Sequence, residues 1–303
     1  MQERLSFEDE ITRNKIKSFL LIGIIFIFFI LLGYAISFAF DPSYFFFIMI
    51  ISIVFSLSYV LISYYNSHKI ALASVRARPA SPIEHRSFFN AVENMSLASG
   101  LPMPKLYVME SEEINAFASG RNPKNAVICI TTGALKKLNK QELEGVIAHE
   151  MSHIANYDIR FMTLTAVLIG MISIISQMFL RNLWFSSYKD RDNKNILIFL
   201  IAIIISILAP IAAQLVSLAI SRKREFSADA SAVKFTRYSP GLVSALEKIK
   251  REHLSTEEIS RESKRYSPAI APLFISDPFK KKIQGLFSTH PPIDARIEKL
   301  KQM

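Results

Sequence analysis

The sequence predicts a mainly α-helical integral membrane protein, in which four transmembrane helices carry an α+β domain with a small sheet. Half of the 303 residues are hydrophobic and the mean hydropathy is +0.27, which is too apolar for an ordinary soluble protein. The apolar residues are concentrated in four long runs. The segments between the runs hold charged helical patterns and short strand-like stretches, such as residues 105–109 and 127–130.

The four apolar runs are long enough to cross a bilayer as helices, which takes about 20 residues. They cover residues 17–40, 44–65, 161–180 and 196–220. The alternative is four buried helices of a large soluble core, but soluble helices rarely stay apolar on every face over five turns. The first run is longer than the core of a signal peptide, so we expect a retained anchor.

Positive charge beside the runs predicts the side of the membrane on which the soluble parts lie. Basic residues precede the first run and follow the fourth, whereas the connection between the first two runs has no Lys or Arg. Because cytoplasmic loops carry this excess, we expect a multi-pass protein of the cell membrane, inner or plasma, with its soluble domain on the cytoplasmic side. The loop over residues 181–195 carries four basic residues against two acidic ones and argues the other way.

The most informative motif is H-E-x-x-H at residues 149–153. Ahead of it, Asn139 and Glu142 have the spacing of a capping box, and apolar residues follow at helical spacing. We therefore predict a helix over residues 140–158. A solvated helix that happens to carry two histidines is the alternative interpretation of this pattern.

On such a helix His149 and His153 share one face, so both rings can bind one zinc ion. Glu150 lies between them and can take a proton from a water on that zinc, which predicts a zinc metalloprotease. A catalytic zinc needs a third protein ligand. Glu225 is the best candidate, and Asp229, one helical turn later, can accept a hydrogen bond from a ligand histidine. The alternative for these two carboxylates is a solvated helix with Arg–Glu and Lys–Asp pairs.

The order of the motifs along the chain supports this ligand set. The third and fourth apolar runs lie between His153 and Glu225. One crossing of about 30 Å would place the two residues on opposite sides of the bilayer, whereas two crossings return the chain to the side that it left. We therefore expect a zinc site at the cytoplasmic membrane surface. The chain then divides into a first hairpin, a first catalytic segment, a second hairpin and a second catalytic segment, at residues 1–70, 71–160, 161–220 and 221–303.

Several motifs together resemble the HtpX-type membrane zinc proteases, which are relatives of the CAAX prenyl proteases. They lie at residues 101–104, 115–120, 149–158, 221–230 and 288–292. The resemblance implies a zincin-like fold of the gluzincin type, with the ligands His149, His153 and Glu225 and with Glu150 as the catalytic base. It also implies a role in the quality control of membrane proteins.

Three further sites complete the prediction. Asn115, Ala116 and Phe117 are expected on an edge strand that pairs with an extended substrate, although an ordinary sheet edge is an equal alternative. His290 precedes a C-terminal helix and is a candidate donor to the oxyanion of the reaction. Arg296, on that helix, is expected to hold Asp229, Glu225 or a substrate carbonyl. The alternatives are a histidine that merely flanks a helix and a surface arginine.

We therefore predict an endopeptidase with one Zn²⁺ per subunit that acts on polypeptides, in particular misfolded membrane proteins. A CAAX-type processing protease and a non-catalytic, zinc-stabilised membrane scaffold or sensor are the alternatives. The net charge of +10 is spread over soluble parts and beside the apolar runs, which indicates contact with anionic lipid head groups and no nucleic acid. The single cysteine, Cys129, is expected to be a buried, inert thiol.

Overall fold

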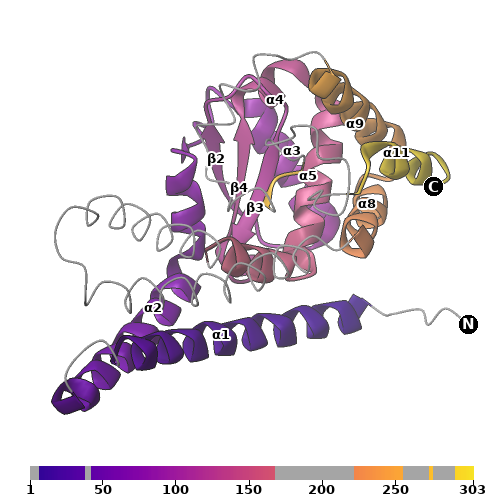
Figure 1. Ribbon diagram of the computed structural model, residues 1–303. Helices are drawn as coiled ribbons and strands as arrows, with labels where there is room; N and C mark the ends of the chain where they lie inside the picture. The colour runs from indigo at the N-terminus through magenta and orange to yellow at the C-terminus, as the bar shows by residue number, and fades with distance from the viewer. Residues whose placement is uncertain (1–6, 38–41, 168–221, 255–272, 276–290) are drawn as a thin grey trace, which may run out of the picture.

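The computed structural model describes residues 7–37, 42–167, 222–254, 273–275 and 291–303 (Figure 1). A globular part with a small sheet lies above two long helices, α1 (Phe7–Ser37) and α2 (Phe45–Ser74). The other helices are α3 (Arg86–Ser99), α4 (Thr132–Lys137), α5 (Lys140–Ala155), α8 (Arg222–Thr236), α9 (Ser239–Leu254) and α11 (Ile293–Lys301). The fold is therefore mainly helical with a small sheet, as predicted.

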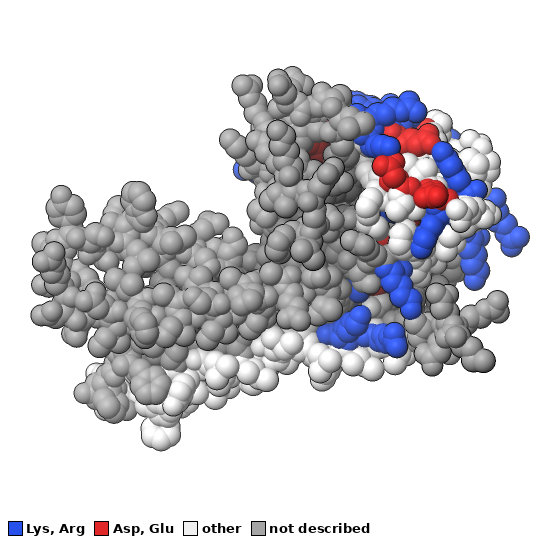
Figure 2. All heavy atoms as spheres, turned by 45° about the vertical axis from the view of Figure 1, so that its right-hand side comes forward, with Lys and Arg blue, Asp and Glu red and all other residues white. Residues whose placement is uncertain are grey.

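Among the described residues, two helices are long and apolar enough to cross a membrane. They are the segment Ile11–Leu31 of α1, with a hydropathy of 2.1, and Phe45–Ser74, with a hydropathy of 2.7. Their large apolar side chains are widely exposed, for example Phe19 and Phe46 at 78% and 77%. In Figure 2 the described surface of the long helices is mostly white, whereas charged side chains gather over the globular part. An exposed apolar surface of this size is what a lipid-facing helix presents.

The third and fourth apolar runs fall largely outside the described residues. Of the predicted span 161–180, residues 161–167 are helical, and the first six of them are buried in the protein. The predicted span 196–220 and the loop 181–195 lie wholly outside the described part of the chain.

The sheet has four strands in the order β1-β2-β4-β3. These are β1 (Arg78–Pro79), β2 (Lys105–Met109), β4 (Ala126–Thr131) and β3 (Ala116–Gly120). β2 and β4 pair in parallel, and β3 runs antiparallel to β4 at the edge. The sheet is therefore mixed, and β3 has the edge position that the sequence predicts.

Both faces of β4 are covered, which explains its unbroken apolar sequence. Ile128 and Ile130 lie in the core with α3 and α5, whereas Val127 and Cys129 pack with Ala71 and other residues near the end of α2. Cys129 is fully buried as predicted, and this burial raises the pKa of its thiol. The end of a candidate membrane helix thus lies directly against the sheet.

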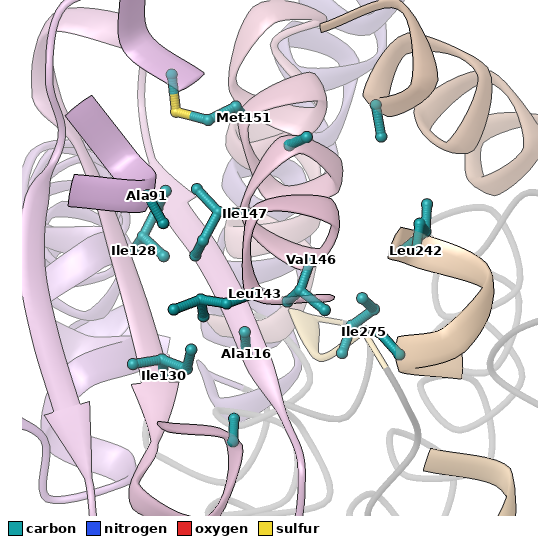
Figure 3. Packing of buried hydrophobic residues seen from close by; sticks show 14 of the residues in the cluster. Ala91, Ala116, Ile128, Ile130, Leu143, Val146, Ile147, Met151, Leu242 and Ile275 are labelled. Carbon is teal, nitrogen blue, oxygen red and sulfur yellow. The ribbon is translucent and has the colours of Figure 1, made fainter. Parts of the chain in front are cut away.

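α5 is the central helix of the globular part. The predicted capping box is present, since Asn139 accepts from the Glu142 N–H and Glu142 accepts from the Asn139 N–H. Leu143 and Ile147 point toward β4, and Val146 points toward Leu242 of α9 and the isolated segment at Ile275 (Figure 3). α5 is thereby fixed between the sheet on one side and α8 and α9 on the other.

The prediction that this helix runs to residue 158 is wrong by three residues. α5 ends at Ala155, a turn follows at Asn156 and Tyr157, and a new helical segment starts at residue 158. Tyr157 adopts a φ of 58°, a left-handed conformation that is unusual for a residue other than glycine. The sequence has no Gly or Pro at this break. Tertiary contacts impose it instead.

Candidate metal centre

Three predicted ligands meet in the interior of the globular part. His149 and His153 lie one turn apart on α5, and Glu225 lies near the start of α8, which packs against α5. Nε2 of His153 is 3.2 Å from Nε2 of His149. The carboxylate oxygens of Glu225 are 3.6 Å from Nε2 of His149 and 3.7 Å from Nε2 of His153. All three side chains are buried.

This triangle of donor atoms has the size that a tetrahedral metal site requires. Nitrogen and oxygen ligands about 2.05 Å from one zinc ion, at the tetrahedral angle, lie about 3.3 Å apart. The three measured distances, between 3.2 and 3.7 Å, fit that separation. Among the described residues no fourth His, Cys, Asp or Glu joins this group. The described residues therefore provide three protein ligands, the number that a catalytic zinc site takes from the protein.

Glu150 points its carboxylate into the same buried region. Burial raises the pKa of Glu150, although the nearby histidines oppose the shift. The backbone of Ala118, on β3, also opposes the shift. The Oε2 atom of Glu150 is buried and has no hydrogen-bond partner among the described residues. A buried carboxylate oxygen without a donor is costly, so this atom is suited to accept a proton from a water or a substrate group.

Asp229 and Arg296 lie directly behind His149. Oδ1 of Asp229 is 3.0 Å from Nδ1 of His149, and Arg296 donates to both oxygens of Asp229. Nη1 of Arg296 is also 3.3 Å from Glu225. Arg296 is 1% exposed, so the alternative of a surface arginine is excluded. Because Asp229 occupies Nδ1 of His149, Nε2 is the ring nitrogen that faces the other two ligands.

The charges around His149 also affect its protonation. Burial and the Arg296 guanidinium disfavour a charged ring, but the contacts with Asp229 and Glu225 outweigh them and raise the pKa of His149 to about 9. In turn, although burial opposes its ionisation, Arg296 and His149 lower the pKa of Asp229. A metal ion binds only the neutral ring, so metal binding at neutral pH must release this proton.

The predicted substrate strand is fully buried. Asn115 is 3% exposed, Ala116 and Phe117 are at most 1% exposed, and the Asn115 side chain accepts from the Ala116 N–H. The Ala116 carbonyl accepts from the Ile275 N–H at 3.0 Å, and Phe117 forms an isolated bridge with Phe274. Part of the edge is thus paired with the chain's own segment 273–275. His290 lies outside the described residues.

Comparison with known proteins assigns the chain to a family. A model of peptidase family M48 matches residues 82–303. The chain belongs to peptidase family M48. This M48 chain is 46% identical over 255 residues to the protease HtpX homolog of Caldanaerobacter subterraneus subsp. tengcongensis, which covers 82% of this chain and 83% of the relative. It is also 41% identical over 298 residues to the protease HtpX homolog of Dictyoglomus thermophilum. That match covers 98% of this chain and 95% of the relative. The resemblance to HtpX-type proteases is therefore confirmed, and the chain is a metallopeptidase.

A solved structure is also similar to this M48 chain. It is the crystal structure of Ste24p from S. mikatae, with a TM-score of 0.46 and 18% identity over 95% of this chain and 65% of that one. A likeness at this level says nothing about the substrates of this chain.

The sequence analysis assigned no role to the group that surrounds His153. Oδ2 of Asp158 is 3.0 Å from Nδ1 of His153, and its other oxygen is 2.7 Å from Nε of Arg224. Asn14, from α1, donates to Asp158 at 2.7 Å. Asp158 follows His153 by five residues, which is not a helical spacing, and only the break at Tyr157 folds it back onto the ring. Local patterns therefore carried no signal for it.

Proposed function

We propose that this M48 metallopeptidase is a membrane-anchored endopeptidase that holds one Zn²⁺ per subunit and hydrolyses peptide bonds in polypeptides. One observation carries the proposal. His149, His153 and Glu225 form a donor triangle of the size that zinc requires, and the buried Oε2 atom of Glu150 nearby has no hydrogen-bond partner among the described residues. A site with three ligands and a neighbouring base is suited to hydrolysis, whereas a structural zinc site has four protein ligands.

The residues of the site have separate tasks in this reaction. Zinc, when bound, polarises a carbonyl and lowers the pKa of water. Glu150 accepts the proton of the attacking water and passes it to the nitrogen of the leaving amine. Asp229 and Arg296 keep His149 in the tautomer that binds metal. We also propose that His290 donates a hydrogen bond to the scissile oxygen as negative charge develops there.

We propose that an extended substrate pairs with β3 beside Glu150. Backbone groups on the open side of an edge strand belong to alternate residues. The Ala116 carbonyl on that side accepts from the Ile275 N–H, and Phe117 bridges Phe274, so the chain's own segment 273–275 pairs along β3 from Ala116 to Ala118. Asn115, Ala116 and Phe117 then support this edge, and the substrate backbone adds to it beyond the segment 273–275.

We further propose four transmembrane helices, with the metal site at the cytoplasmic surface of the cell membrane. The helices α1 and α2 support the first hairpin. The close approach of His153 to Glu225 supports an even number of crossings between them, because both residues must reach one side of the membrane. A protease in this place meets misfolded membrane proteins, so quality control of such proteins is the role that we propose.

The test uses the full chain purified in detergent. We expect about one zinc per subunit by elemental analysis, and cleavage of unfolded casein and of an unfolded membrane protein that stops with a chelator and returns with Zn²⁺. A prenylated peptide and its unmodified twin are assayed in parallel. Cleavage of the prenylated peptide alone would establish the processing function instead. Stoichiometric zinc without any cleavage would establish the scaffold.

A further inference from the structure

Asp158 is a buried carboxylate that is bound from three directions. It is 1% exposed and lies at the start of the helical segment 158–167. Its Oδ2 atom is 3.0 Å from Nδ1 of His153. Its Oδ1 atom accepts from Nδ2 of Asn14 at 2.7 Å and pairs with Nε of Arg224 at 2.7 Å. Asp158 thus connects the metal ligand His153 to Arg224, which precedes Glu225, and to the helix α1.

The contact with His153 decides how that ring faces the metal site. Nε2 of His153 lies toward His149 and Glu225, so Nδ1 is the nitrogen that remains for a second partner. A carboxylate at Nδ1 keeps the proton there and leaves the Nε2 lone pair for the metal. Asp158 therefore has the same relation to His153 that Asp229 has to His149.

Asn14 reaches this group from a candidate membrane helix. It lies within Ile11–Leu31, the apolar segment of α1, and is 7% exposed. Its amide nitrogen donates to Oδ1 of Asp158 at 2.7 Å and to the carbonyl of Asn156 at 3.0 Å. Both hydrogens of the amide are therefore used, which offsets the cost of burying it.

The same contacts hold the turn at Asn156 and Tyr157 in place, and this turn orients Asp158. Asn156 and Asp158 flank Tyr157, whose φ of 58° is strained for a side chain of this size. Asn14 binds the residues on both sides of it, and Nζ of Lys15 lies 4.6 Å from the centre of the Tyr157 ring. Such a conformation persists only where its surroundings enforce it. Two neighbouring residues of α1 provide part of that enforcement.

We propose that Asn14 is a positioning residue for the metal centre. It holds Asp158 against Nδ1 of His153, so that the membrane helix α1 sets the affinity of the site for zinc. This inference rests on the proposed zinc site. The competing explanation is that Asn14 only anchors α1 to the globular part.

The experiment measures zinc affinity in the full chain, purified in detergent, by competition with a chromophoric chelator. The variants are Asn14→Leu, Asp158→Asn and the two combined, with Ser37→Ala as the control. Ser37 is a buried polar residue of the same helix, and its hydroxyl donates to the Tyr34 carbonyl within α1. Loss of a partner behind a metal ligand lowers metal affinity by about 10–100-fold.

We expect Asp158→Asn to weaken zinc binding by about 10–100-fold and Asn14→Leu by about 10-fold, with Ser37→Ala unchanged. Because Asn14 acts through Asp158, the combined variant should bind zinc no more weakly than Asp158→Asn alone. The visible absorption of the Co²⁺-substituted protein should also change in Asn14→Leu, since it reports ligand geometry. Asn14→Ala, which removes the same donor with less apolar bulk, is the second variant should Asn14→Leu not fold.

The outcomes separate this proposal from the function on which it rests. A wild-type chain that binds no zinc overturns the proposed function. If the Asn14 variants keep normal zinc affinity and an unchanged Co²⁺ spectrum and have only a lower melting temperature, the positioning role is overturned. Asn14 then only anchors α1 to the globular part. If the losses of zinc affinity are fully additive in the combined variant, Asn14 does not act through Asp158. That result overturns the positioning role as well.

Discussion

Arg296 binds Asp229 through two parallel hydrogen bonds, from Nε to Oδ2 at 2.9 Å and from Nη2 to Oδ1 at 2.7 Å. Only the planar guanidinium matches both oxygens of a carboxylate in this way. The residues lie on α11 and α8, and Asp229 in turn contacts His149 on α5. This ion pair therefore joins three helices behind one metal ligand.

Replacing Arg296 should damage both stability and metal binding. Removal of one partner of a buried ion pair costs about 3–5 kcal/mol, since the other charge stays buried without compensation. We expect Arg296→Met to lower the melting temperature of the purified chain and to weaken zinc binding. Arg251→Met is the control, because this arginine has a 77% exposed side chain and lies 3.9 Å from Glu247. Unchanged zinc affinity in Arg296→Met would contradict the role of the pair.

Replacing Glu150 should separate metal binding from catalysis. We expect Glu150→Gln to keep its zinc and to lose hydrolysis by a factor of about 10²–10⁴, because the amide cannot accept the proton of the water. Elemental analysis and casein cleavage measure the two properties. Glu144→Gln is the control on the same helix, where the carboxylate accepts an exposed hydrogen bond from Nδ2 of Asn94. Cleavage at the wild-type rate by zinc-loaded Glu150→Gln would refute the assignment of the base.

The capping box of α5 should make stability depend on pH. Although burial opposes its ionisation, hydrogen bonds from Lys248, Ser244 and the Asn139 N–H hold the pKa of Glu142 below its usual value. A carboxylate whose pKa is lower in the folded chain contributes its full stability above the unfolded pKa of about 4.3, and loses it as pH falls through the folded value.

We therefore expect Glu142→Gln to destabilise the chain by about 1–2 kcal/mol at pH 7 and by much less near pH 3. Thermal unfolding of wild type and variant at both pH values, with metal removed from both, measures the difference. An equal difference at the two pH values would show that the charge of Glu142 contributes nothing.

Gly145 should tolerate no side chain, because α5 and α9 approach closely there. A Cβ atom at this position would lie 2.7 Å from the backbone nitrogen of Leu242 and 2.9 Å from its Cα. Since backbone atoms cannot move aside singly, we expect Gly145→Ala to cost about 1–3 kcal/mol. Gly23→Ala is the control, because a Cβ there meets nothing within 4 Å. Equal melting temperatures for the two variants would show that the helices can separate freely.

The sequence was informative wherever a local pattern determines the structure. The capping box at Asn139 and Glu142 and the spacing of His149 and His153 were sufficient to predict α5 and the direction of its ligands. Glu225 was found because a catalytic zinc needs a third ligand. By contrast, the contacts of Asn14 with Asp158 and of Ile275 with Ala116 join residues 144 and 159 positions apart in the chain. Such contacts depend on tertiary packing and leave no periodic signal in the sequence.

The separation of Glu225 from the two histidines also has a consequence for biosynthesis. A ribosome makes His149 and His153 first, then residues 161–220, and only afterwards Glu225, Asp229 and Arg296. Two histidines alone bind zinc weakly and leave Glu150 without an ordered partner. A metal site built from all three side chains can therefore form only after both apolar runs and residue 225 have been synthesised.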